Sequence, residues 1–356
     1  MDLRYQKLAK ILINYSTKAK KGDRVLIHMK EPEAFPLVKA IYKEAILKGA
    51  FPEVYFSSVY FTYDRLKFGS DLQVKYYPKV DDASIDWADV WLGIRAVKNP
   101  YELKGIDSKR LAEDQKIYGR LATKRVKKCR WVLCWVPTEA MAQKAQMSMD
   151  ETIDFFFKAT IRNWEKEAKK YKKIQKVFQK GKKVRIVGKE TDISFSTEGR
   201  KYVIGNGSYN MPDGEIFTAP VKTTVEGRIY FDIPSSRGGQ IVRDIYLEFK
   251  QGKVVRARAK EGQRFLEEAL AMDRGASYIG EFGIGVNFGI KRWVLDTLFD
   301  EKIGGTIHLA LGHAYEECGG KNKSDLHWDL IKDLKKQGEI FVDEKMVFRK
   351  GKFLIN

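Results

Sequence analysis

The sequence is poor in cysteine, in histidine and in long apolar runs. Its three cysteines, Cys129, Cys134 and Cys318, form no even disulfide framework and include no CxxC pair, which suits a reducing compartment. No apolar run approaches the roughly 18 to 20 residues that cross a bilayer, and the charged first 24 residues lack the apolar core of a signal peptide. We therefore expect a cytoplasmic protein with no membrane segment.

Acidic residues are outnumbered by basic ones, which leaves a formal charge of +19. Such an excess raises nucleic-acid binding as a hypothesis, because clustered cations neutralise phosphates. The densest run, residues 166–183, nevertheless places Ile174, Val177 and Phe178 on one helical face and its lysines on the other. A solvated helix face is the preferred interpretation of this run. Abundant Lys, Arg and Glu with few Cys are also typical of heat-adapted proteins.

The first half alternates strand and helix patterns. Apolar, β-branched runs predict strands at residues 24–29, 52–56, 88–94 and 130–136, and helical spacing predicts helices at 32–48, 108–128 and 138–160. This order predicts an α/β domain with a mostly parallel sheet flanked by helices. No GxGxxG follows the first strand, so a dinucleotide site has no support. His28 lies inside that strand, where a hydrogen-bonded core histidine is the preferred interpretation.

The pattern changes near residue 182, where a charged helix over residues 163–180 ends at Gly181. We expect domains at 1–182 and 183–356, the second a strand-rich α+β domain. Its predicted strands cover residues 184–187, 192–196, 201–204, 228–231 and 244–250, and its predicted helices cover 261–272 and 328–337.

Imidazole is concentrated in residues 304–329, which contain three of the four histidines. His327 and Asp329 stand at i and i+2, so on an extended segment both side chains point to one face. His308 lies in an alternating run, 306–311. Upstream, Glu215 and Glu281 each follow a glycine. Imidazole and carboxylate bind borderline divalent cations, and two-metal sites typically share one carboxylate. The spacing alone leaves open both a metal site and a chance cluster.

Five segments, in order, carry a more specific signal. They are GKETDISFSTEGR (188–200), NMPDGEIFTAP (210–220), GEFGIGVN (280–287), DEKIGGTIHLALGHAY (300–315) and SDLHWDLI (324–331). Together they resemble the successive blocks of the thermophilic metalloaminopeptidases of the aminopeptidase T and aminopeptidase S type. Metal in that family is held by two glutamates, a histidine, a tyrosine and a His-x-Asp pair. The matching positions here are Glu215, Glu281, His308, Tyr315, His327 and Asp329.

The resemblance implies hydrolysis of the first peptide bond of peptides with a free amino terminus, by a homodimer. The implied cofactors are two divalent ions (cobalt, zinc or manganese) about 3.5 to 4 Å apart that share a bridging water. By analogy with other bridged sites, Glu281 is the expected shared ligand. Glu215 either binds one ion or accepts a proton from the water, and Tyr315 either binds metal or donates to the developing oxyanion.

Several nearby residues fall outside this assignment. We expect His313 not to bind metal and Cys318 to be an inert thiol, and a role for Glu316 or Glu317 is left open. Two other kinds of function also stay open. One is a binding module for RNA or an acidic partner, and the other is a metal-binding protein of the same fold without catalysis.

Overall fold

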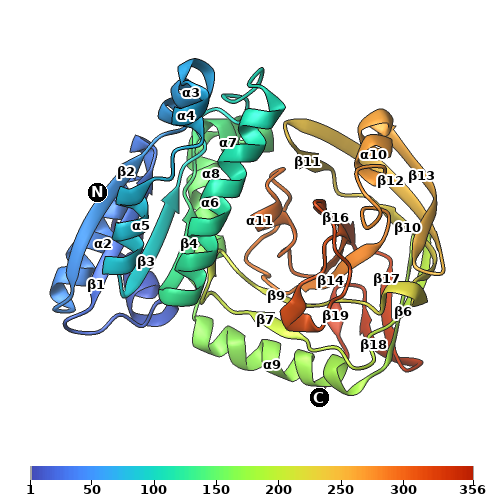
Figure 1. Ribbon diagram of the computed structural model, residues 1–356. Coiled ribbons are helices and arrows are strands. Elements are labelled where there is room, and N and C mark those ends of the chain that lie inside the picture. The colour runs from blue at the N-terminus through green and yellow to red at the C-terminus, as the bar shows by residue number, and fades with distance from the viewer. Residues whose placement is uncertain (1, 356) are drawn as a thin grey trace. The chain divides into compact units, whose positions relative to one another are not determined.

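The structure is a computed structural model that describes residues 2–355, and it contains two compact units (Figure 1). The first unit comprises residues 1–161 with 207–212, and the second comprises 162–206 with 213–356. The expected division at residue 182 assigns helix α9 (Trp164–Lys180) to the first domain, whereas α9 belongs to the second unit. The Gln175 side-chain amide donates to the Tyr202 carbonyl at 2.5 Å, and the ring of Phe178 lies 6.4 Å from that of Phe282. These contacts are long-range, so the local pattern did not contain them.

A five-stranded parallel sheet forms the centre of the first unit, with strand order β2-β1-β3-β4-β8 (Figure 1). From β1 the chain adds β2 on one side of the sheet, and it then adds β3, β4 and β8 on the other side. The strand order therefore reverses between β1 and β3. The strands are β1 (Arg24–Lys30), β2 (Phe51–Ser57), β3 (Val90–Arg95), β4 (Arg130–Trp135) and β8 (Asn210–Met211). The first four confirm the strands predicted in this half.

Along the chain, the helices of the first unit either precede β1 or lie between its strands. They are α1 (Leu3–Lys10), η1 (Ile11–Ser16), η2 (Pro32–Ala34), α2 (Phe35–Leu47), α3 (Val59–Phe68), α4 (Asp71–Val74), α5 (Lys79–Trp87), α6 (Ser108–Lys128), α7 (Glu139–Ala145) and α8 (Met149–Thr160). The single helix predicted over 138–160 is wrong, because it divides into α7 and α8. Gln146 adopts a left-handed φ of 54°, and Ser148 with Glu151 forms a capping box that starts α8.

Two antiparallel sheets make up most of the second unit. The larger has nine strands and the smaller has five, in the order β16-β15-β14-β9-β7. The strands are β5 (Lys183–Gly188), β6 (Thr191–Ser196), β7 (Val203–Gly205), β9 (Glu215–Thr218), β10 (Glu226–Phe231), β11 (Ser235–Arg237), β12 (Gln240–Lys250), β13 (Lys253–Glu261), β14 (Ile279–Gly285), β15 (Thr306–Gly312), β16 (His327–Asp333), β17 (Gly338–Val342), β18 (Lys345–Arg349) and β19 (Lys352–Phe353). Short helices η3 (Lys222–Thr224), α10 (Gln263–Leu270), α11 (Thr297–Asp300) and η4 (Glu316–Cys318) connect them. The parallel first sheet and the strand-rich second unit confirm the predicted fold class.

The smaller sheet has one apolar face. Phe282 of β14 is buried with its ring 5.0 Å from Phe195 of β6 and 6.4 Å from Phe178 of α9. Because neighbouring side chains on a strand point to opposite faces, Glu281 is directed to the other face. The apolar side therefore holds the sheet against the rest of the unit and leaves its other face to polar groups.

The helix predicted from residue 328 is wrong, because residues 327–333 form strand β16. This strand pairs with β15 along its whole length. The indole Nε1 of Trp328 also donates to the Ser235 hydroxyl at 2.8 Å, so a distant strand fixes this side chain. Pairing with the edge of β15 outweighs a weak local helical pattern.

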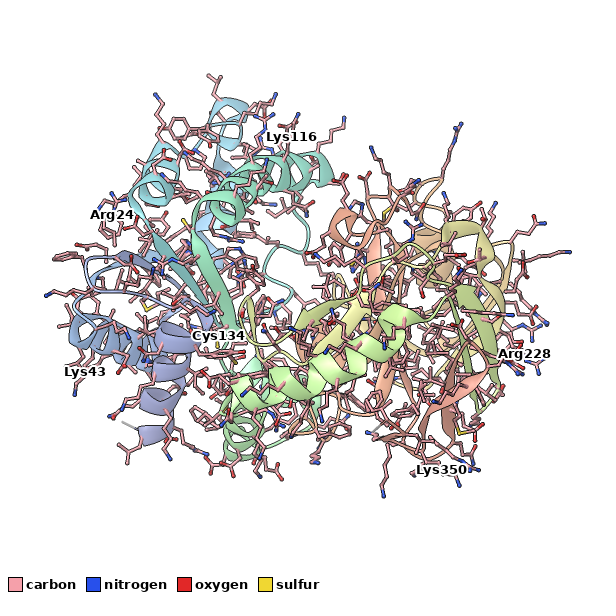
Figure 2. The ribbon with its side chains drawn as sticks, turned by 90° about the horizontal axis from the view of Figure 1, so that it is seen from below. Arg24, Lys43, Lys116, Cys134, Arg228 and Lys350 are labelled. Atoms are coloured by element: carbon pink, nitrogen blue, oxygen red, sulfur yellow. The ribbon has the colours of Figure 1, made fainter. Side chains whose placement is uncertain are left out.

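Basic side chains are spread over both units. Figure 2 shows Arg24 and Lys43 on the first unit and Arg228 and Lys350 on the second, and all four are exposed. This distribution agrees with the scattered basic residues of the sequence. None of the helices between residues 2 and 355 combines the length and apolarity that a membrane span requires.

Candidate metal centre

Polar side chains gather on one face of the smaller sheet in the second unit, opposite the face that carries Phe282. Four adjacent strands supply them, one or two residues each. They are Glu215 at the start of β9, Glu281 on β14, His308 on β15, and His327 and Asp329 on β16.

The strand register explains why these side chains share a face. Ala310 of β15 lies opposite both Glu281 and Asp329, and His308 lies opposite Gly283. Residues paired directly across antiparallel strands point to the same side, and so do residues two apart on one strand. The alternation expected for His308 and for the His-x-Asp pair therefore brings them together with Glu281.

Small residues leave room for these larger side chains. A Cβ atom on Gly283 would overlap the imidazole of His308, so the ring lies directly over that backbone. Gly214, before Glu215, has a φ of 121°, a conformation that favours glycine, and a Cβ there would contact Asn287. These two glycines permit a close approach that a side chain would prevent.

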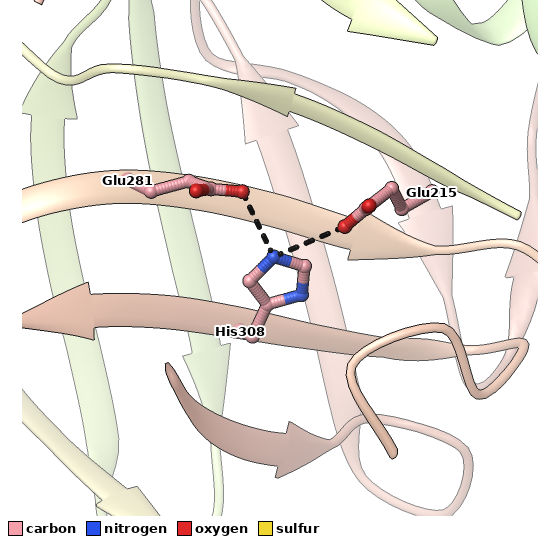
Figure 3. A group of neighbouring side chains, drawn as sticks. All are labelled: Glu215, Glu281 and His308. Atoms are coloured by element: carbon pink, nitrogen blue, oxygen red, sulfur yellow. Dashed lines mark hydrogen bonds and ion pairs between the residues drawn. The ribbon is translucent and has the colours of Figure 1, made fainter. Parts of the chain in front are cut away.

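The first cluster consists of Glu215, Glu281 and His308 (Figure 3). The imidazole Nε2 of His308 lies 3.2 Å from Oε1 of Glu281 and 3.5 Å from Oε2 of Glu215. His308 is fully buried, and Glu215 and Glu281 are 7% and 4% exposed. Two carboxylates and one imidazole thus meet in a space screened from water.

The second cluster consists of Glu281, His327 and Asp329. Nε2 of His327 lies 3.5 Å from Oε2 of Glu281 and 3.6 Å from Oδ2 of Asp329. Glu281 therefore belongs to both clusters, with Oε1 toward His308 and Oε2 toward His327. The Tyr315 hydroxyl lies 3.5 Å from His327 Nε2, which places the predicted tyrosine beside this second cluster.

Both histidines are oriented by backbone carbonyls. Nδ1 of His308 lies 3.1 Å from the Glu301 carbonyl oxygen, and Nδ1 of His327 lies 3.0 Å from that of His313. A carbonyl only accepts, so each Nδ1 carries the proton and donates it. When the rings are neutral, each Nε2 therefore carries no proton, and its lone pair faces the carboxylates. Metal-binding histidines use this arrangement.

A buried lysine, which sequence reasoning missed, adjoins the first cluster. Lys302 is fully buried, its Nζ lies 3.3 Å from Oε1 of Glu215, and it also forms an ion pair with Glu301. It sits in the turn after α11, where no alternation marks which side chains point inward. The DEKIGG segment was the only signal available, and it does not distinguish a solvated lysine from a buried one.

The pKa values record how strongly these charges interact. Burial lowers the pKa of His308, but its hydrogen bond to Glu281 and the charges of Glu281 and Glu215 outweigh this and raise it to about 10. Burial raises the pKa of Glu215 to about 8, although the charge of Lys302 opposes the shift. The pKa of His327 is also raised, since Asp329 and Glu281 outweigh its burial. The clusters therefore attract positive charge, as protons or as cations.

The remaining nearby residues do not join the clusters. Glu316 and Glu317 are exposed. His313 contributes its backbone carbonyl to His327, and its ring lies 6.4 Å from that of Tyr315. Cys318 is buried against Ala219 and Ala314, and burial raises the pKa of its thiol to about 12, which makes it a poor nucleophile and ligand at neutral pH.

The donor set fits divalent metal. Each cluster offers imidazole nitrogen and carboxylate oxygen, which zinc, cobalt and manganese all accept. A bound cation would accept the lone pairs of both Nε2 atoms and would neutralise the excess negative charge of the carboxylates.

Comparison with known proteins gives a consistent result. The family described as thermophilic metalloprotease (M29) matches residues 1–353. Aminopeptidase 2 of Geobacillus stearothermophilus is 27% identical over 349 residues, covering 87% of this chain and 83% of its own. Aminopeptidase AmpS of Bacillus subtilis strain 168 is 30% identical over 270 residues. This match covers 66% of this chain and 65% of the length of that protein.

The fold has a solved counterpart. The structure of wild-type AmpT from Thermus thermophilus superimposes with a TM-score of 0.85 at 22% identity and covers 99% of both chains. At this identity the likeness shows the fold. The family match, in contrast, extends over nearly every residue of the sequence, and it shows that the chain belongs to the M29 family of thermophilic metalloproteases.

Proposed function

We propose that this protein is a metal-dependent aminopeptidase that removes the N-terminal residue from peptides, using two divalent ions and a water between them. One observation carries the proposal. The two carboxylate oxygens of Glu281 face two different histidines, at 3.2 Å from His308 and 3.5 Å from His327. A carboxylate placed in this way suits a ligand shared between two metals.

The two clusters define the proposed ligand sets. Glu215, Glu281 and His308 hold one ion, and Glu281, His327 and Asp329 hold the other, with Tyr315 beside the second. When bound, two such ions lower the pKa of a shared water, polarise the scissile carbonyl and bind a neutral α-amine. The identity of the ions (cobalt, zinc or manganese) is a part of the proposal that rests on the donor chemistry alone.

The protein residues have separable roles in this proposal. Oε1 of Glu215 is paired with Lys302 while Oε2 faces His308, which suits a ligand better than a proton acceptor. Burial, followed by the charges of Glu281 and Asp329, raises the pKa of Tyr315, so its hydroxyl keeps its proton at neutral pH. We assign Tyr315 to donate a hydrogen bond to the oxyanion that develops on the substrate carbonyl.

The exposed side of the clusters favours catalysis over a purely structural metal site. Tyr315 is 40% exposed, whereas the five other proposed residues are buried or, for His327, partly buried. Structural sites are closed, while catalytic sites keep a position open to water or substrate. The scattered basic residues give less support to nucleic-acid binding as the main function. A cytoplasmic homodimer acting on peptides with a free amino terminus completes the proposal, on the basis of the family resemblance.

The test is release of the N-terminal residue from leucyl peptides by metal-stripped protein, with and without cobalt, zinc or manganese. The same peptides blocked by N-acetylation are the substrate control. We expect activity that requires both metal and a free amine. Hydrolysis of the acetylated peptides at a similar rate, or activity unaffected by chelation, would contradict the proposal.

Counting bound metal in variants tests the shared ligand. We expect two ions in the unmodified protein, one in His308→Ala and one in His327→Ala, because each of these changes removes one cluster. Glu281→Gln should weaken both sites. His313→Ala is the matched control for metal binding, since it removes a histidine side chain from the same segment that lies outside both clusters, and it should retain both ions. Two tightly bound ions in Glu281→Gln would refute the shared-ligand assignment.

A further inference from the structure

The first unit contains a cavity of about 320 Å³ that no part of the proposed peptidase reaction uses. It opens at the carboxyl ends of three parallel strands, where Lys30 ends β1, Ser57 ends β2 and Arg95 ends β3. All its lining residues belong to the first unit. The strand order reverses between β1 and β3, and ligands of open α/β sheets bind at this kind of edge.

Three cations line this cavity: Lys30, Arg95 and Arg125 of α6. Within residues 2–355 none of the three makes an ion pair. The two carboxylates in the wall are already engaged. Asp114 is paired with Arg65, which lies outside the lining, and Asp81 accepts a hydrogen bond from the Tyr55 hydroxyl at 2.7 Å. Three cations thus share the lining with two carboxylates, one of which is paired with Arg65 outside it, so the cavity carries a net positive charge.

Aromatic rings hold the two arginines in place. The guanidinium of Arg125 lies 4.2 Å from the ring centre of Trp91 and 5.3 Å from that of Trp131, and the guanidinium of Arg95 lies 4.8 Å from Trp135. Stacking uses the flat face of a guanidinium and leaves its N–H edge for planar or tetrahedral anions. Nε of Arg125 is buried and donates to no group among the described residues.

The electrostatics agree with this arrangement. Burial lowers the pKa of Arg125 to about 10, and the charge of Arg95 adds to the effect. Burial and then Arg95 also lower the pKa of Lys30. His28 bonds the Ser57 hydroxyl through Nε2 at 2.6 Å, and burial with these cations lowers its pKa to about 4, which keeps the ring neutral. The three cations thus repel each other across a space that an anion would fill.

We propose that the first unit binds a small phosphate-bearing molecule in this cavity, with its phosphate between Lys30, Arg95 and Arg125. Two guanidinium edges and one ammonium match the charge and the several acceptor oxygens of a phosphate better than those of a single carboxylate. Ser57 and Thr62 also line the cavity. A volume near the lower end of ligand pockets, about 300 to 1,000 Å³, admits a small ester and no polymer.

The experiment is calorimetric titration of the full-length protein with inorganic phosphate and with pyrophosphate, at constant ionic strength set by sodium chloride. We expect saturable binding to the unmodified protein that weakens at least about tenfold in Arg125→Gln and in Arg95→Gln. Arg120→Gln is the matched control, because Arg120 lies on α6 with Arg125 but is exposed. It should bind as the unmodified protein does.

Three results would overturn the proposal. They are no binding of either probe, equal weakening in Arg120→Gln, and unchanged binding in Arg125→Gln, which would place the anion elsewhere, for example at the metal centre. Lys30→Met provides a variant that disturbs no aromatic stack among those described, so its circular dichroism and its phosphate affinity together separate lost binding from lost folding.

Discussion

Lowering the pH should release metal from the two clusters steeply, because protons compete for the same ligands. His308 has a pKa of about 10 without metal, and Glu215 a pKa of about 8. An imidazole or a carboxyl group binds metal only after losing its proton. The affinity for metal therefore falls as the pH falls below these values, and the sign is the same for both groups.

The expected size follows from the pKa values. At pH 7, removing the proton of His308 costs about three pKa units, or about 4 kcal/mol of metal-binding free energy. Each unit of decreasing pH then weakens binding about tenfold through His308, and Glu215 adds up to a further tenfold below pH 8. Between pH 8 and pH 6 the affinity should decrease at least about a hundredfold.

The assay is competition for cobalt against a chromophoric chelator at pH 6, 7 and 8, corrected for protonation of the chelator. Calorimetry in two buffers of different ionisation enthalpy counts the protons released. His308→Gln should release about one proton fewer than the unmodified protein, whereas His313→Gln should release the same number. An affinity that changes less than about tenfold from pH 8 to pH 6, with no protons released, would refute the reasoning.

Two further variants test the surroundings of the clusters. Gly283→Ala forces the imidazole of His308 from its position, so metal affinity should fall about 10- to 100-fold with a loss of stability of about 1 to 3 kcal/mol; unchanged metal titration would contradict this. Lys302→Met removes the buried cationic partner of Glu215 and Glu301 and should lower the free energy of unfolding by about 3 to 5 kcal/mol in urea titrations of metal-free protein. Lys332→Met is the matched buried control with a smaller expected loss, because its partner Asp232 is 31% exposed and reaches water; equal losses would count against the argument.

The sequence predicted much of the local structure and all the residue types of the candidate site. The first four strands of the parallel sheet follow from short apolar, β-branched runs, which depend on neighbours in the chain. The predicted ligands came from five ordered motifs, and the structure brings those residues together. Their role in binding metal stays a prediction.

Where local pattern and tertiary contacts compete, prediction was less successful. The segment at residues 328–337 was expected to start a helix, yet residues 327–333 pair with β15 and form strand β16. Helix α9 was expected in the first domain, yet its packing places it in the second unit. In each case the deciding partner lies far away in the sequence, so no window of neighbouring residues contains it.

By itself the sequence indicated which residues could bind metal, through the five ordered motifs of the family resemblance and the i, i+2 spacing of His327 and Asp329, which are local properties. Only the tertiary structure decided that Glu281 turns one oxygen to each histidine, that backbone carbonyls orient both rings, and that Lys302 is buried. It also decided that three cations from separate elements of the first unit meet in one cavity. Strand order and register set these distances, and both arise from pairing between segments far apart in the chain.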